Sequence, residues 1–190
     1  MLVLGGHAYR FEGHAIVSGD DRIADASGAT PPSLRIEADW VRFQAALDQS
    51  AVTVLGRLGH EANPNRAGRN RLVLSSAARG VERRGDAWWW NPAEASLDQA
   101  LSASAPEGGL VAIPGGMRVF DLFLAVGYDA FHLTRVADVS VPDGTPLFST
   151  VGRAHGADEV LAAHGLRPAA RERLAPGAWL TIWRTDTATA

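Results

Sequence analysis

The chain has 190 residues, of which 46% are hydrophobic and 21% charged, an ordinary balance for a folded protein with a sizeable core. Its formal net charge of −3 gives no reason to expect a nucleic-acid partner. All 18 basic residues are arginine and cysteine is absent, which excludes Schiff-base lysines, disulfides and thiolate sites. No apolar run reaches transmembrane length, and the N-terminus lacks the basic lead of a signal peptide. We therefore expect no membrane partner and a cytoplasmic location.

In chain order, the first elements are a strand over 13–21, a loop over 24–34 and a helix over 35–49. Two adjacent prolines bar a helix within the loop. Apolar residues of the helix recur at spacings of three and four, and this stripe is expected to face the core. The residues of the stripe are Ile36, Trp40, Phe43 and Leu47.

The remaining pattern continues the alternation of strands and helices. We expect strands over 51–55, 71–74, 86–91, 108–116, 129–136 and 177–185, and helices over 93–102 and 117–127. Loops without an obvious helical pattern join the last strands. This order predicts one α/β domain over 1–190, with three layers and a doubly wound, mostly parallel central sheet. The C-terminal strands are expected to form an antiparallel edge.

Three predicted strand ends carry residue pairs suited to a dinucleotide, namely Gly56–Arg57, Ser75–Ser76 and Gly115–Gly116. An arginine fork and hydroxyl groups bind phosphate oxygens, and a glycine pair before a helix brings backbone N–H groups toward a pyrophosphate. Each pair also has an ordinary explanation as a solvated strand end or a tight turn. Together, at one edge of a parallel sheet, they favour a dinucleotide site. The first strand lacks the G-x-G-x-x-G of the Rossmann fingerprint, so a different nucleotide fold is needed.

The order of these pieces resembles the dihydrofolate reductase superfamily, which includes the pyrimidine reductase of riboflavin synthesis. The resemblance covers residues 13 to about 148 and implies that superfamily's fold. Four segments carry it: LGRLGHE (55–61), GRNRLVLSS (68–76), IPGGMRVFDLF (113–123) and HLTRVADVSVPDGTPLF (132–148).

The resemblance implies NADPH as the cofactor. Arg57 and Ser76 would hold the 2′-phosphate, and the Gly115–Gly116 pair would face the pyrophosphate across a cis peptide. Gly59 stands where the family usually has a small hydroxyl residue, so that contact would come from backbone N–H. The positions implied to contact the cofactor are Ala15, Ile23, Gly56, Arg57, Leu58, Gly59, Ser75, Ser76, Ile113, Gly115, Gly116, Met117, Arg118, Val119, Phe120 and Thr145.

On the substrate side, the resemblance implies that Asp39 is the pterin-binding carboxylate and that Thr134 bonds to it; these are the two expected catalytic residues. Ile16, Phe43 and Arg69 would contact the substrate. Asp39 has an alternative explanation as a first-turn aspartate that stabilises the helix dipole. Arg69, which would hold the glutamate carboxylate of folate, is nearly as well explained as a solvated loop arginine.

The substrate itself stays open between dihydrofolate or another pterin and a ribosylamino-pyrimidine. The loop over 24–34 lacks the family's usual tryptophan, so a non-catalytic nucleotide-binding member is a further alternative. His60 and Glu61 have no second ligand at metal-binding spacing, and the other histidines are scattered along the chain, so we expect no metal. The sequence leaves open whether the chain is a monomer or a homodimer.

Overall fold

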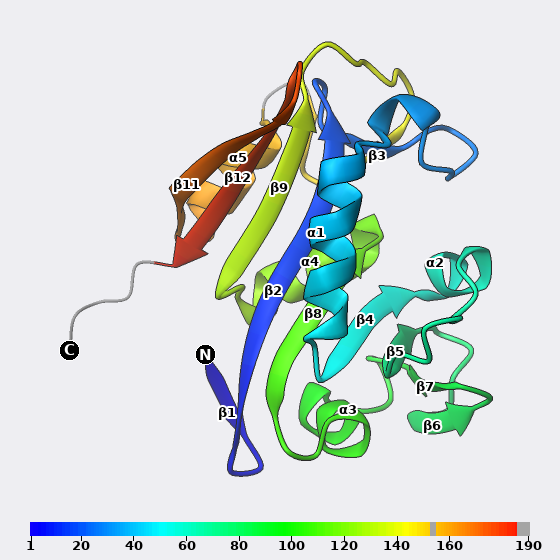
Figure 1. Cartoon of the computed structure of the whole chain (residues 1–190). Coiled ribbons are helices and arrows are strands. Elements are labelled where there is room, and N and C mark those ends of the chain that lie inside the picture. The colour runs from blue at the N-terminus through cyan, green and yellow to red at the C-terminus, as the bar shows by residue number, and fades with distance from the viewer. Residues whose placement is uncertain (153–154, 186–190) are drawn as a thin grey trace.

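The computed structural model describes residues 1–152 and 155–185 (Figure 1). The strands are β1 (Leu2–Leu4), β2 (His7–Ser18), β3 (Arg22–Ala24), β4 (Val52–Gly56), β5 (Arg71–Leu74), β6 (Val81–Arg84), β7 (Ala87–Trp90), β8 (Gly109–Gly115), β9 (Ala130–Val136), β10 (Thr145–Pro146), β11 (Leu166–Ala175) and β12 (Ala178–Thr185). The helices are η1 (Pro32–Leu34), α1 (Glu37–Asp48), α2 (Arg57–Ala62), α3 (Leu97–Ser104), α4 (Met117–Val126) and α5 (Ala157–Ala163).

The central sheet has the strand order β11-β12-β9-β2-β8-β4-β5-β7-β6, with β1 paired to β2 outside this path. The strands from β9 to β7 run parallel to one another. The edges are antiparallel, with β12 and β11 beyond β9 and with β6 beyond β7. This arrangement confirms the predicted α/β fold class with its antiparallel C-terminal edge.

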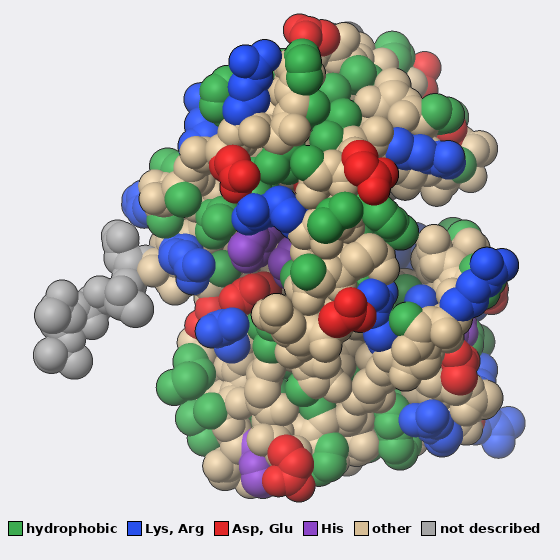
Figure 2. Space-filling model, viewed as in Figure 1, with side chains coloured by type: hydrophobic (Ala, Val, Ile, Leu, Met, Phe, Trp, Pro, Cys, Tyr) green, Lys and Arg blue, Asp and Glu red, His purple; other side chains and the backbone are tan. Residues whose placement is uncertain are grey.

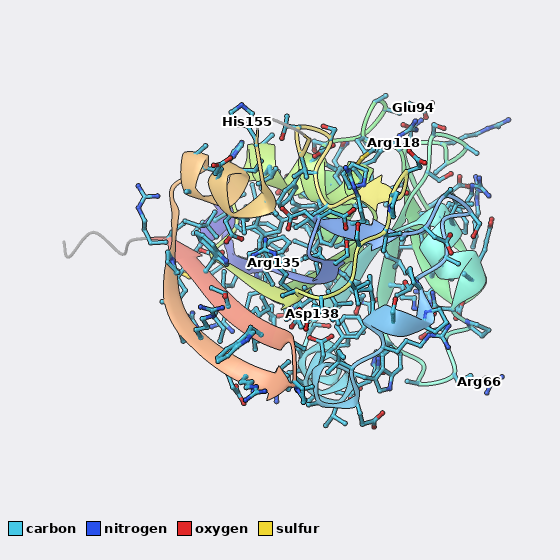
Figure 3. The ribbon with its side chains drawn as sticks, turned by 90° about the horizontal axis from the view of Figure 1, so that it is seen from above. Arg66, Glu94, Arg118, Arg135, Asp138 and His155 are labelled. Atoms are coloured by element: carbon cyan, nitrogen blue, oxygen red, sulfur yellow. The ribbon has the colours of Figure 1, made fainter. Side chains whose placement is uncertain are left out.

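Helices cover both faces of the sheet, which gives the three predicted layers. Helix α1 lies on one face, while α4 and α5 lie on the other (Figures 1 and 3). The carboxyl ends of the parallel strands meet at the upper edge in Figure 1, where β3 and β10 form a small second sheet. None of the helices in the described residues is long and apolar enough to cross a membrane.

The apolar core is larger on one face of the central sheet than on the other. On the α4 side, the main cluster contains several aromatic rings in contact, among them Phe11 and Phe123, which are tilted at 45° with 5.4 Å between ring centroids. Side chains alternate along β2, so that Phe11 points into this core while Glu12 and His14 point toward α1. The core cluster on the α1 side is small and centres on Leu34. Polar side chains therefore lie on the sheet face beneath α1.

Two expectations about helices were wrong. Helix α3 begins at Leu97 rather than at residue 93, because a capping box fixes its start: Ser96 Oγ accepts from Gln99 N at 3.2 Å, and Gln99 Oε1 accepts from Ser96 N at 2.8 Å. The late strands are not joined by loops alone, since α5 precedes β11. This helix has only seven residues, too few for a helical period to stand out.

The stripe on α1 does not face the core throughout. Leu47 is buried, but the side chain of Trp40 is 55% exposed. Its ring lies 5.9 Å from that of Phe43, and both residues line an open cleft instead of a closed interior. The helical period was therefore correct, but the side of α1 that it marks faces an open cleft as well as the core.

Candidate functional site

A cleft of about 1220 Å³ lies between α1 and the sheet and reaches the start of α4. Its outline appears in Figure 2 as a gap between the lobe that carries residues 22–36 and the lobe that carries α2. This is the carboxyl edge of the parallel strands, where open α/β sheets bind ligands. Residues expected on both the substrate and the cofactor side share its wall: Ala15, Ile16, Ile23, Asp39, Phe43, Arg69, Gly116 and Phe120.

The two expected catalytic residues are in direct contact. Thr134 is fully buried, and its Oγ1 donates a hydrogen bond to Asp39 Oδ1 at 2.5 Å. Burial raises the pKa of Asp39, although the Thr134 hydrogen bond and the charge of Arg42 act to lower it. The carboxylate is thus a desolvated hydrogen-bond acceptor in the wall of the cleft, held in place from the neighbouring strand.

Arg69 is anchored to α1 instead of being solvated. Its Nε donates to Asp48 Oδ1 at 2.8 Å, and its Nη1 donates to Gln44 Oε1 at 2.8 Å. Its side chain is only 16% exposed and lines the cleft. Since Asp48 already offsets part of its charge, Arg69 could hold an anionic part of a ligand only by sharing or exchanging this partner.

The Gly115–Gly116 pair forms the turn between β8 and α4, with φ values of 103° and 75°. The cis peptide implied by the resemblance is absent: every peptide bond in the described residues is trans. Two positive φ angles already turn the chain sharply, and a cis bond outside X-Pro costs about 2.5–4 kcal/mol. A Cβ at Gly115 would strike the ring of Phe120 at 2.2 Å, whereas one at Gly116 would meet nothing within 4 Å and would project into open space.

Arg57 is the first residue of α2 and directly follows the last residue of β4. Its Nη1 donates to both oxygens of Glu61, at 2.8 and 2.9 Å, and both side chains are about half exposed. Ser75 uses its hydroxyl locally, accepting from Ala77 N at 3.2 Å, while Ser76 is exposed. Of these strand-end groups, Arg57 and Ser76 are therefore open to a ligand, and Ser75 supports the turn.

The other positions implied by the resemblance divide by burial. The side chains of Ile113 and Val119 lie in the main core, so only their backbone is available to a ligand. Arg118 is exposed at the start of α4, and Figure 3 shows it on the α4 side of the sheet. Gly56 and Leu58 flank Arg57 in the chain, and Gly59 follows them in α2. Met117 is half-buried at the start of α4. Thr145 lies in β10, where it pairs with Ala24 of β3.

The structure also assembles a cluster that the sequence did not reveal. His14 on β2 and His132 on β9 are register partners, and their rings stack at 4.6 Å between centroids. Glu12, two residues before His14, places Oε2 3.5 Å from His132 Nε2. Burial lowers the pKa of His14 to about 4, and His132 adds to this effect. The histidines are scattered in sequence, but two of them meet; only the strand pairing could have brought them together.

Comparison with solved structures shows that the chain has the dihydrofolate reductase-like fold. A dihydrofolate reductase from Enterococcus faecalis, complexed with NADP(H) and RAB-propyl, superposes with a TM-score of 0.64 at 16% identity, over 93% of this chain and 96% of that one. A putative riboflavin biosynthesis protein from Shewanella sp. PV-4 gives a TM-score of 0.63 at 16% identity, over 92% and 98%.

A third solved structure is the diaminohydroxyphosphoribosylaminopyrimidine deaminase/5-amino-6-(5-phosphoribosylamino)uracil reductase from Thermotoga maritima. Its TM-score is 0.60 at 15% identity, and the match covers 93% of this chain but 56% of that one. No family model and no curated protein matches the sequence. The predicted fold is thus confirmed at the level of structure.

Proposed function

We propose that this chain is an NADPH-dependent reductase that transfers hydride to a pterin-type substrate such as dihydrofolate. The observation that carries this proposal is the Asp39–Thr134 pair in the wall of a cleft that also reaches the Gly116 turn. Each carboxylate oxygen has two lone pairs, so Asp39 can accept from Thr134 at Oδ1 and still accept two parallel hydrogen bonds from an N–C–N edge, one at each oxygen. The fold of a dihydrofolate reductase complexed with NADP(H) supports this choice.

The residues at the carboxyl edge fit a dinucleotide. Gly116 is exposed, and the space beside its Cα is open, so a pyrophosphate can approach the backbone at the start of α4. Arg57 offers a guanidinium at the end of β4 for the 2′-phosphate after release from its surface pair with Glu61. When bound, NADPH supplies the hydride.

The protein's own groups would bind and orient the substrate. Phe43 offers an aromatic face in the cleft, and Asp39 fixes the polar edge of the ring. The negative charge of Asp39 favours protonation of the ring nitrogen beside the carbon that receives hydride. Thr134 positions the carboxylate through the 2.5 Å hydrogen bond and touches no substrate itself, because it is fully buried.

A second candidate is reduction of a ribosylamino-pyrimidine of the riboflavin pathway. Arginines that line the cleft are compatible with it, since Arg66 and Arg69 could bind a phosphate as well as the carboxylate of folate. Two of the superposed structures carry riboflavin-pathway descriptions. The third alternative, nucleotide binding without catalysis, predicts the cofactor site alone.

One experiment separates these candidates. Purified protein is mixed with NADPH, nicotinamide fluorescence is followed for binding, and oxidation is then followed with dihydrofolate, other dihydropterins and ribosylamino-pyrimidines. Oxidation with a pterin supports the main proposal, and oxidation with only the pyrimidine supports the second candidate. Binding without turnover on any of them supports a non-catalytic role. No binding of NADPH would overturn the proposed function as a whole.

A further inference from the structure

The floor of the cleft beneath α1 carries three potential metal ligands on two neighbouring strands. Glu12 and His14 lie two residues apart on the same face of β2, and His132 lies beside His14 on β9. The ligand atoms of the three side chains lie within 4.8 Å of one another. All three residues line the cleft, and histidine side chains are visible there in Figure 2 between α1 and β12.

Burial without hydrogen-bond partners sets this cluster apart from a solvated polar patch. His14 is only 8% exposed, and its Nε2 is fully buried with no hydrogen-bond partner in the described part of the chain. His132 Nε2 is likewise buried and makes no hydrogen bond within those residues, although Glu12 Oε2 lies 3.5 Å away. Leaving a buried polar atom unpaired is unfavourable, so the unpaired His14 Nε2 beside the long 3.5 Å contact of His132 with Glu12 indicates an absent partner.

We propose that Glu12, His14 and His132 bind a divalent transition-metal cation such as Zn²⁺, with the remaining coordination position open to the cleft. Two imidazoles and one carboxylate suit zinc and its first-row neighbours, whereas magnesium and calcium prefer oxygen ligands alone. Three protein ligands with a free fourth position are the arrangement of reactive zinc sites, as opposed to closed structural ones. The proposal does not depend on the proposed reductase activity.

The Glu12–His132 pair already has the spacing of metal ligands, whereas the His14 ring, stacked at 16° to that of His132, must turn before its nitrogen can point at the same ion. Two ligands of a tetrahedral zinc ion, each at about 2.0–2.1 Å from the metal, lie about 3.3 Å apart. The 3.5 Å between His132 Nε2 and Glu12 Oε2 is already close to this spacing. Arg10 Nε contacts the other carboxylate oxygen, Glu12 Oε1, at 2.9 Å, and so orients the carboxylate while leaving Oε2 for the ion.

The test is direct metal binding by the full chain. Protein freed of metal by a chelator is titrated with Zn²⁺ by calorimetry, and with Co²⁺ by visible absorption, because the d–d bands of Co²⁺ report the number and type of ligands. The variants are His14→Gln, His132→Gln and Glu12→Gln. His7→Gln is the matched control, since His7 lies on the same strand but outside the cluster and is exposed.

We expect one equivalent of Zn²⁺ to bind the wild type and the His7 control, and to raise their melting temperature because the ion binds only the folded state. Each cluster variant should bind at least about 100-fold more weakly, since loss of a direct ligand exceeds the effect of losing an orienting partner. If His14→Gln fails to fold, His132→Gln carries the test, as His132 is less buried. Absence of Zn²⁺ and Co²⁺ binding at micromolar concentrations, or equal affinity in the wild type and the His132 variant, would overturn the proposal.

Discussion

The hydroxyl of Thr134 in β9 donates a hydrogen bond of 2.5 Å to Asp39 in α1, and the two residues are 95 positions apart in the sequence. The helix thereby presents a carboxylate at a fixed point of the cleft, while the buried threonine keeps one of its oxygens occupied. Under the proposed function, one residue of the pair binds the substrate and the other positions the first. Asp39 lines the cleft, and under this function Thr134 would act only through Asp39.

Asp39→Asn tests the role in turnover. The substitution keeps the size of the side chain but replaces one acceptor oxygen with a donor and removes the charge. We expect NADPH affinity to be unchanged and turnover at neutral pH to fall by about 100-fold or more, in the range of lost acid–base support. Part of the rate should return at low pH, where substrate arrives protonated. Steady-state oxidation of NADPH across pH measures this, with Thr134→Val expected to show a weaker form of the defect. Wild-type turnover by the Asn variant would remove Asp39 from the chemistry.

Asp39→Asn should also change the stability of the folded protein. Burial raises the pKa of Asp39 above its ordinary value of 3.8, so the folded state binds the proton more tightly than the unfolded state. The free energy of unfolding therefore falls as pH rises from 3.8 through the raised value, and the cost persists at neutral pH. Asp39→Asn should be more stable than the wild type at neutral pH, with the difference shrinking below about pH 4. Urea unfolding at several pH values tests this; a gap independent of pH would contradict it.

Cofactor choice is expected to depend on Arg57. Arg57→Ala should weaken NADPH much more than NADH, because one charge-assisted contact contributes about 1.5–3 kcal/mol, on the order of tenfold or more. Glu61→Gln is the control: it removes the carboxylate that holds Arg57 in the structure and should leave NADPH affinity equal or slightly higher. Affinities come from nicotinamide fluorescence. Equal losses for both cofactors in the Ala variant would mean that Arg57 has only a structural role.

The sequence was informative where local patterns decide structure. The turn around Gly115–Gly116 and the strand ending at Gly56 both follow from short motifs and their order. The resemblance supplied the contact between Asp39 and Thr134, which no local pattern could give. Strand β6 was missed because VERR has few apolar residues and its antiparallel partner β7 supplies the packing.

Side-chain clusters between distant segments were beyond the sequence. His14 and His132 meet only because β2 and β9 pair in parallel with this register, and a shift of one residue would move them to opposite faces. The exposure of Trp40 has a similar origin: a helical stripe shows which side faces the sheet but not whether the space there is filled. Strand register and the packing of side chains in the space beside a helix are tertiary properties, set by the sheet as a whole.

Gly116→Val should abolish NADPH binding in a folded protein. A side chain there meets no protein atom within 4 Å, so it would fill the open space beside the turn. With φ 75° and ψ 151°, Gly116 has a backbone conformation that is essentially restricted to glycine, and any other residue there costs about 1–3 kcal/mol. Gly6→Val is the matched control, because Gly6 has a φ of 86° and equally open surroundings far from the cleft. Both variants should lose stability, which is measured beside binding, but only the first should lose the cofactor; unchanged affinity would exclude the turn from the site.

Arg135 forms ion pairs with Asp21 and Asp158 near the carboxyl end of β2. Asp21 is buried: its Oδ1 accepts from Arg135 Nη2 at 2.6 Å, and its Oδ2 accepts from Ala157 N at 2.8 Å at the start of α5. Arg135, which lies below α5 in Figure 3, also donates to Asp158 at 2.8 Å. Burial acts to lower the pKa of Arg135, but the hydrogen bonds that Arg135 donates to Asp158 and Asp21 outweigh it, and the net shift is upward. The guanidinium therefore stays charged and depends on both carboxylates.

Asp21→Asn should lower the free energy of unfolding by about 3 kcal/mol, the low end for breaking a buried pair and leaving its partner charged. The φ of 60° at this position is tolerated by asparagine, so the substitution adds no backbone strain. Asp158→Asn is the control, since its side chain is 50% exposed and its pair with Arg135 should contribute no more than about 1 kcal/mol. Urea unfolding of both variants measures the difference. If the Asp158 variant loses as much stability as the Asp21 variant, the desolvated contact with Asp21 does not hold this edge, and the backbone bond to Ala157 becomes the group to test.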